Sequence, residues 1–192
     1  MRKLKILSNK DFYEKSIKEF GVSAQGVHWN SKFTQYKRFE ILTKCIKKSI
    51  QNSSIVDVGC GFGEYYNYLS HNHKLPQKYV GIDCEEKMID VCNIRFPNEE
   101  FMVQNVLDDK LLDADYYICS GAMNILTFDE VEIFIKRCFE ASNKGFVFNY
   151  LKNVTFNDIK QYHIEEICKR YTQNIILKDG YLDNDFTIFM VK

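Results

Sequence analysis

The sequence has little proline or tryptophan, no long hydrophobic run and no formal net charge. It contains two prolines and one tryptophan in 192 residues, and no stretch has the biased composition of a disordered linker. No segment approaches the ~18 consecutive apolar residues of a membrane span. The first five residues are charged and lack the apolar run of a secretory signal. We therefore expect a soluble protein, and the zero net charge disfavours bulk electrostatic binding to nucleic acid.

The charge is unevenly distributed along the chain. Residues 1–50 carry twelve Lys and Arg against four Asp and Glu, whereas residues 51–192 carry fourteen against twenty-two. One interpretation is an N-terminal helical segment with a solvated basic face. The other is a positive rim for an anionic substrate or for RNA. The sequence leaves both interpretations open.

Cysteine and histidine do not form the patterns of a disulfide framework or a metal site. The seven cysteines are odd in number and contain no C-x-x-C pair, so we expect most of them to be small buried residues in a reducing cytoplasm. His71 and His73 form an isolated pair in a polar loop, where histidines are usually solvated. We expect no bound metal. The cysteines are Cys45, Cys60, Cys84, Cys92, Cys119, Cys138 and Cys168.

Hydrophobic spacing changes at residue 55. Before it, the spacing predicts a helix over 11–20 and a longer helix over 31–50, separated by a polar loop. After it, short β-branched strands alternate with helices. The expected strands are 55–58, 79–82, 101–103, 115–119, 145–149, 173–177 and 185–191, and the helices are 64–70, 85–95, 129–141 and 157–170.

This alternation predicts an α/β fold with a largely parallel sheet covered by helices on both faces, a three-layer sandwich. The turn Lys178-Asp-Gly-Tyr is too short for a parallel crossover, so the last two strands should form an antiparallel hairpin. We expect two parts: an N-terminal helical extension or lid over residues 1–50, and a ligand-binding domain over residues 51–192.

A glycine-rich turn lies between the first strand and its helix, in Asp57-Val-Gly-Cys-Gly-Phe-Gly63. Glycines there allow a sharp turn and close approach of a ligand to the backbone, at the edge where open parallel sheets bind ligands. The dinucleotide fingerprint G-x-G-x-x-G would need a glycine at position 64, where the chain has Glu64. A nicotinamide oxidoreductase is therefore disfavoured.

The glycines at 59, 61 and 63 and the preceding acid resemble the D-x-G-x-G-x-G signature of the class I S-adenosylmethionine-dependent methyltransferases. The resemblance continues at the next two strand ends, in Val80-Gly-Ile-Asp-Cys-Glu-Glu-Lys-Met-Ile89 and Phe101-Met-Val-Gln-Asn-Val106. It covers about residues 50–192. It implies a Rossmann-like, seven-stranded sheet, S-adenosylmethionine as the cofactor and methyl transfer as the reaction.

The resemblance also implies roles for individual residues. Asp83 would bind the ribose hydroxyls, Cys84 would pack on the adenine, and Asn105 would accept from the adenine amine while the next amide reaches a ring nitrogen. Cys84 is equally consistent with a buried structural cysteine, and Arg38, expected on the cofactor carboxylate, with a surface arginine paired to an acid. The predicted cofactor residues are Arg38, Asp57, Gly59, Cys60, Gly61, Gly63, Asp83, Cys84, Met88, Asn105, Val106 and Ser120.

The methyl acceptor is less constrained. The segment after the fourth strand, residues 119–124, lacks both the Asn/Asp-Pro-Pro-aromatic box of exocyclic-amine base methylation and the Pro-Cys pair of cytosine-C5 enzymes. In-line methyl transfer needs mainly positioning, and His28 and His163 have only their residue type in favour of a role as base. We assign no catalytic residue. The candidate substrate or lid residues are Trp29, Gln35, Tyr36, Asn124 and Tyr150.

We therefore predict transfer of a methyl group from S-adenosylmethionine to O, N or C of a small molecule, because the final hairpin turn is too short to hold a recognition domain. One alternative is an RNA or protein methyltransferase that uses the basic N-terminal segment. Another is a non-catalytic partner protein that keeps the fold. The sequence does not predict the oligomeric state.

Overall fold

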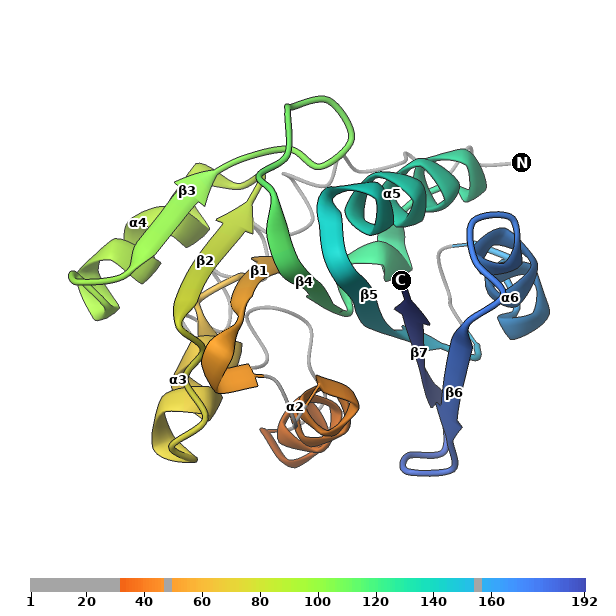
Figure 1. Ribbon diagram of the computed structural model, residues 1–192, viewed down its shortest axis with the longest axis horizontal. Coiled ribbons are helices and arrows are strands. Elements are labelled where there is room, and N and C mark those ends of the chain that lie inside the picture. The colour runs from red at the N-terminus through yellow and green to blue at the C-terminus, as the bar shows by residue number, and fades with distance from the viewer. Residues whose placement is uncertain (1–31, 47–49, 154–156) are drawn as a thin grey trace, which may run out of the picture. The chain divides into compact units, whose positions relative to one another are not determined.

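A computed structural model describes residues 32–46, 50–153 and 157–192 (Figure 1). The chain divides into two compact units, Met1–Tyr36 and Lys37–Lys192. The helix expected over 11–20 lies outside the described residues. The unit that contains the sheet begins at Lys37, before the boundary predicted at residue 51, because it includes most of the helix that precedes the sheet.

The sheet has seven strands in the order β3-β2-β1-β4-β5-β7-β6. The pairs β2–β3, β1–β2, β1–β4 and β4–β5 are parallel, whereas β7 is antiparallel to both β5 and β6. The predicted mostly parallel sheet with a closing antiparallel hairpin is confirmed. The strands are β1 Ser54–Val58, β2 Lys78–Asp83, β3 Glu100–Val103, β4 Ala114–Ser120, β5 Ser142–Leu151, β6 Ile175–Asp179 and β7 Asp185–Val191.

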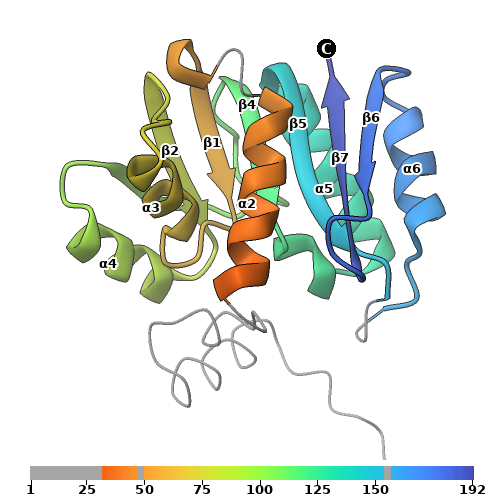
Figure 2. The same ribbon diagram turned by 90° about the horizontal axis from the view of Figure 1, so that it is seen from below.

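Helices cover both faces of the sheet (Figures 1 and 2). One face carries α2 from Lys37 onward, together with α3 and α4, and the other carries α5 and α6. The bounds are α2 Lys32–Ile46, α3 Glu64–His71, α4 Glu86–Arg95, α5 Phe128–Ala141 and α6 Gln161–Lys169, with short 3-10 turns η2 Ile50–Asn52 and η3 Ala122–Ile125. Among these helices, none has the length and apolar character needed to cross a bilayer.

The core on the α5 and α6 face is formed by alternate strand residues packed against one side of each helix. Phe146, Phe148 and Tyr150 of β5 are fully buried there, as the two-residue period of a strand requires. A capping box fixes the start of α5, because Thr127 accepts from the Glu130 amide while the Glu130 carboxylate accepts from the Thr127 amide. The cap sets the helix in the register that buries its apolar side.

The other face holds α2 through both apolar and ionic contacts. The Phe39 ring lies 5.3 Å from that of Tyr65, between ring centroids, and Leu42 is fully buried. A buried ion pair joins Arg38 of α2 to Asp185 at the start of β7, with Nη2 2.9 Å from Oδ2 and Nε also donating to Oδ1. This two-point contact ties α2 to the start of β7.

The helix predicted over 31–50 is described as α2 over Lys32–Ile46. The bounds expected for three other elements were wrong. β5 begins at Ser142, directly after α5, rather than at residue 145, and the strand predicted over 173–177 is β6 Ile175–Asp179. The helix predicted from residue 157 begins at Gln161. There the Asn157 side chain donates to Leu126 O at 2.7 Å and accepts from the Ile159 amide at 3.1 Å. These bonds hold residues 157–160 in a loop instead of a helical turn.

The Arg38–Asp185 ion pair predicts how the free energy of unfolding changes when one or both residues are replaced. Replacing Asp185 with Leu alone leaves the Arg38 charge buried without its carboxylate, which should cost about 3–5 kcal/mol, whereas the double change Arg38→Met/Asp185→Leu should recover most of that loss. Urea unfolding of the wild type, both single variants and the double variant measures this. A double variant that is less stable than either single variant would contradict a pair that acts as one unit.

Candidate functional site

The candidate site lies at the carboxyl edge of the parallel strands. β1 pairs with β2 on one side and β4 on the other, so successive crossovers leave in opposite directions at this point, and ligands of such sheets bind in the crevice outside it. The chain leaves β1 in the turn of residues 59–63. The turn is fixed from β2, because the amides of Gly59 and Cys60 both donate to Ile82 O, at 2.8 and 3.0 Å.

Glycine is required in this turn for conformation and for space. Gly59, Gly61 and Gly63 have φ values of 69°, 54° and 74°, in the left-handed region that other residues adopt at a cost. A Cβ on Gly59 would also overlap the Cβ of Ala122 in η3. The turn therefore packs directly against the Ala122 side chain, in the segment that follows β4.

Asp83, at the end of β2, is tied to the glycine turn. Its Oδ2 accepts from the Gly61 amide at 2.9 Å and its Oδ1 from the Glu85 amide at 3.0 Å. Burial raises the pKa of Asp83, and these backbone hydrogen bonds partly oppose the rise. Each carboxylate oxygen keeps acceptor capacity beyond one backbone bond, so a fixed carboxylate is available to two hydroxyl donors.

Asp57 is a buried carboxylate beneath the same turn. It is 2 % exposed, and the Tyr79 hydroxyl donates to its Oδ2 at 2.6 Å. Burial raises the pKa of Asp57 to about 7, and the bond from Tyr79 opposes that rise. A rise of this size from the usual 3.8 corresponds to roughly 4 kcal/mol against the charged form. The pKa of Asp57 therefore lies near neutral pH.

The end of β3 places amide groups at the same edge. The side-chain oxygen of Asn105, Oδ1, accepts from the Leu107 amide at 3.1 Å, and its Nδ2 donates to Asp108 at 2.6 Å. Its carbonyl has a second lone pair. The neighbouring Gln104, which the sequence did not indicate, has a buried Oε1 with no hydrogen-bond partner in the described part of the chain. This edge therefore offers two amide oxygens.

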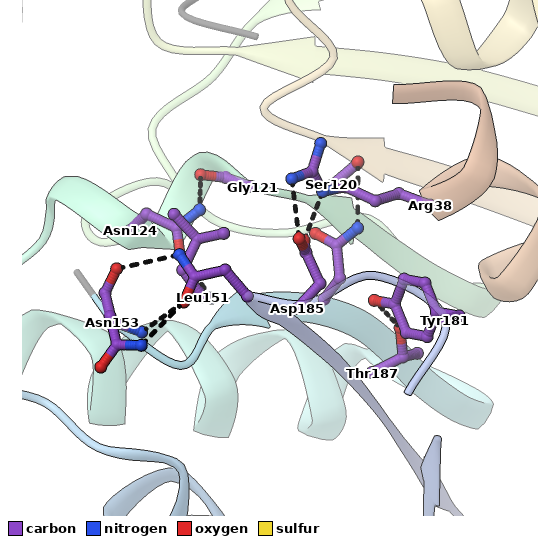
Figure 3. A network of polar contacts seen from close by, with 11 residues as sticks. Arg38, Ser120, Gly121, Asn124, Leu151, Asn153, Tyr181, Asp185 and Thr187 are labelled. Atoms are coloured by element: carbon purple, nitrogen blue, oxygen red, sulfur yellow. Dashed lines mark hydrogen bonds and ion pairs between the residues drawn. The ribbon is translucent and has the colours of Figure 1, made fainter. Parts of the chain in front are cut away.

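A second group of polar side chains lies on the α2 face, toward β7 (Figure 3). Ser120, Asn149 and Thr187 are register partners across β4, β5 and β7. Asn149 Nδ2 donates to Ser120 Oγ at 3.4 Å, and Thr187 Oγ1 lies 2.8 Å from the Tyr181 hydroxyl. We call Ser120, Asn149, Tyr181 and Thr187 the polar row. Asn149 and Thr187 are at most 1 % exposed, whereas Ser120 and Tyr181 are half-buried.

The comparisons with known proteins point to methyltransferases. Residues 55–145 match the methyltransferase domain family. Rv1506c of Mycobacterium tuberculosis, which bears a provisional methyltransferase name, is 29 % identical over 160 residues, covering 72 % of this chain and 93 % of its own. The chain is therefore similar to methyltransferases over the stretch that contains the glycine turn and the next two strand ends.

Solved structures have the same fold. A TehB-like methyltransferase from Corynebacterium glutamicum superposes with a TM-score of 0.69 at 18 % identity, covering 96 % of this chain and all of that one. The magnesium protoporphyrin IX methyltransferase of Synechocystis, solved with S-adenosylmethionine bound, gives 0.68 at 14 % identity, covering 95 % and 84 %. The glycine turn, Asp83 and Asn105 therefore lie at three adjacent strand ends of a sheet that shares its fold with these methyltransferases.

The other predicted cofactor residues differ in exposure. Cys60, Met88 and Val106 are buried, whereas Cys84 is exposed. The expectation of a buried structural cysteine at 84 was wrong, because the residue lies between β2 and α4, where no element of the described chain covers it. Five of the seven cysteines are buried as expected.

Arg38 is paired with an acid, the alternative that the sequence left open, although it is buried rather than at the surface, and Tyr150 lies on the α5 face of the sheet. Two nitrogens of Arg38 contact Asp185, so its predicted bond to a cofactor carboxylate would compete with a protein carboxylate. Tyr150 is fully buried on the α5 face, with its hydroxyl 3.4 Å from Asn157 Oδ1. Its predicted place at the acceptor was wrong, because the period of β5 turns it to the opposite face.

The remaining acceptor candidates are less informative. Asn124 bridges the ends of β4 and β5, because it donates to Gly121 O at 3.0 Å and accepts from the Leu151 amide at 3.1 Å. Gln35 is buried and Tyr36 is half-buried. Trp29 lies outside the described residues.

Exposure of Cys84 beside Asp83 gives a direct reporter of ligand binding. We expect maleimide to label Cys84 at pH 8 slowly, because burial of part of the side chain and the nearby acids raise the pKa of the thiol to about 11. Saturating S-adenosylhomocysteine should slow that labelling several-fold. Half-buried Cys45 on α2 is the control. Peptide mass spectrometry measures the labelling rates of both cysteines. Equal slowing of Cys84 and Cys45 by the ligand would contradict a ligand site beside Asp83.

Proposed function

We propose that this protein binds S-adenosylmethionine along the carboxyl edge of β1, β2 and β3 and transfers its methyl group to a small-molecule acceptor. The observation that carries the proposal is the Asp83 carboxylate, held by the amides of Gly61 and Glu85 with acceptor capacity remaining on both oxygens. A carboxylate at this strand end suits the two vicinal hydroxyls of a ribose.

The residues around Asp83 fit the rest of the cofactor. The second lone pair of the Asn105 carbonyl suits the adenine amine, and exposed Cys84 has room to contact the ring. Gly59, Gly61 and Gly63 lack side chains, so the methionine portion could approach the backbone of the turn closely. Ser120 lies at the end of the adjacent strand β4.

When bound, the cofactor supplies an electrophilic methyl group on a sulfonium, which a positioned nucleophile can attack in line. The task of the protein is then to bind both partners and exclude water. We assign Ser120 and Tyr181, the two half-buried members of the polar row, to the acceptor side of the site, because each offers a hydroxyl group on the α2 face. Their hydroxyl groups suit a polar molecule that presents O, N or C to the methyl group.

The size of the acceptor follows from the last connection. Only residues 180–184 join β6 to β7, which is too short for a recognition domain and favours a small acceptor. The basic segment within residues 1–50, which suggested an RNA or protein acceptor, falls largely outside the described residues. That alternative stays a prediction.

Isothermal titration calorimetry with S-adenosylmethionine and S-adenosylhomocysteine tests the proposal. The wild type should bind both ligands, and Asp83→Ala should weaken each by roughly 10- to 100-fold, the worth of charge-assisted hydrogen bonds to two hydroxyls. Asp90→Ala is the matched control, because it removes an exposed carboxylate on α4.

Three outcomes decide the assignment. Weakened binding in the Asp83 variant alone supports it. Equal binding by the wild type and the Asp83 variant places the cofactor elsewhere. No binding of either ligand to the wild type at millimolar concentration contradicts the proposed function itself.

A further inference from the structure

The turn that follows β3 is closed by hydrogen bonds between its own residues. The amides of Asp108 and Asp109 both donate to the main-chain oxygen of Asn105, at 3.2 and 2.9 Å. The Asn105 amide in turn donates to Asp109 Oδ2 at 2.7 Å. We call residues 105–109 the β3 turn. These contacts fix the backbone of the turn, and with it the position from which the Asn105 side chain projects.

Helix α5 holds the β3 turn against the domain. Arg137 Nη1 donates to Leu107 O at 2.8 Å, and Arg137 Nη2 donates to Asp109 O. The guanidinium presents these donors in a rigid planar fork, so it holds both carbonyl groups in one geometry. Val106, in the same turn, is buried in the core on the α5 face. The turn is therefore attached to the domain by both polar and apolar contacts.

The β3 turn permits only one orientation of the Asn105 side-chain amide. Its Oδ1 accepts from the Leu107 amide at 3.1 Å, and its Nδ2 donates to Asp108 Oδ2 at 2.6 Å. The reversed amide would bring two donors together at Leu107 and two acceptors together at the Asp108 carboxylate. Two partners of opposite hydrogen-bonding character thus determine where the oxygen of the Asn105 amide lies.

The fixed orientation determines which purine the site prefers. The β3 turn starts beside the proposed ribose-binding carboxylate, because the preceding Gln104 amide donates to Asp83 O at 2.9 Å. One acceptor site remains on Asn105 Oδ1, which suits the amino group at C6 of adenine. A purine with an oxo group at C6 would present an acceptor to the same oxygen. Binding that purine would require reversal of the amide and loss of its hydrogen bonds to Leu107 and Asp108.

We propose that Asp108 is a specificity-determining positioning residue: it holds the Asn105 amide so that the cofactor site selects a purine with an amino group at C6 over one with an oxo group. The inference rests on the proposed function, in which Asn105 faces the adenine amine. Asp108 acts through Asn105, and Arg137 holds the turn that carries both residues. Because the Asp108 carboxylate only accepts hydrogen bonds, an Asn in its place removes this constraint while keeping the size of the side chain.

Calorimetric titration with S-adenosylhomocysteine and S-inosylhomocysteine tests the role of Asp108. The second ligand has an oxo group at C6 and a hydrogen on N1, and is otherwise the same molecule. The wild type should prefer S-adenosylhomocysteine by roughly 10- to 100-fold. Asp108→Asn should reduce that preference by roughly three- to tenfold, the contribution of one hydrogen bond, because an amide at position 108 can pair with either orientation of the Asn105 amide.

Asp113→Asn is the matched control and should retain the wild-type preference. It makes the same change at an exposed carboxylate between β3 and β4 that forms no hydrogen bond with Asn105 within the described residues. A preference lost equally in this control assigns the effect to charge alone and overturns the inference.

The remaining outcomes separate the inference from the proposed function. An unchanged preference in Asp108→Asn, or equal weakening of both ligands, overturns the inference, because a merely structural role would not alter the choice between purines. Equal binding of the two ligands by the wild type also overturns it and leaves the proposed function intact. Failure of the wild type to bind either S-adenosylhomocysteine or S-adenosylmethionine contradicts the proposed function instead.

Discussion

The hydrogen bonds that attach the glycine turn, residues 59–63, to the end of β2 are the contacts on which the site depends. Two amides of the turn share Ile82 O, and a third reaches Asp83 Oδ2, so the loop after β1 and the carboxylate after β2 fix each other. This coupling requires the left-handed conformation at Gly59 and Gly61, because other residues adopt it only at a cost. The arrangement yields a bare backbone surface beside a fixed acid at the switch point of the sheet.

The α2 face of the sheet buries polar groups, which lower the stability of the fold. A sheet face under a helix is normally apolar, yet this one buries the Asp57 carboxylate, the Arg38–Asp185 ion pair and the amide of Asn149. Buried polar groups stabilise a fold less than well-packed apolar residues do. The α5 face, packed with Phe146 and Phe148, carries the apolar core of the domain. The buried polar groups thus lie on the α2 face and the main apolar core lies on the α5 face. This distribution suits a sheet whose α2 face adjoins a ligand site and whose α5 face stabilises the fold.

Much of this was predictable because it depends on short-range patterns. The strand and helix alternation, the closing hairpin and the glycine spacing are local, and the structure confirms the sheet that they predict. The partners of buried charges are not local: Arg38 and Asp185 are 147 residues apart, and Tyr79 meets Asp57 only through strand pairing. Tyr150 shows a related limit, since the strand was predicted to end at residue 149, whereas β5 runs to Leu151 and its alternation places Tyr150 on the α5 face. The exposure of Cys84 depends on which elements cover it, and no motif encodes that.

A crystal structure of the complex with S-adenosylhomocysteine is the most direct test of the central claim, that the carboxyl edge of β1 to β3 is a cofactor site built around Asp83. The account predicts both ribose hydroxyls within hydrogen-bond distance of the Asp83 carboxylate and the adenine amine directed at the Asn105 carbonyl. A ligand bound elsewhere, or ribose hydroxyls turned to solvent away from Asp83, would contradict it.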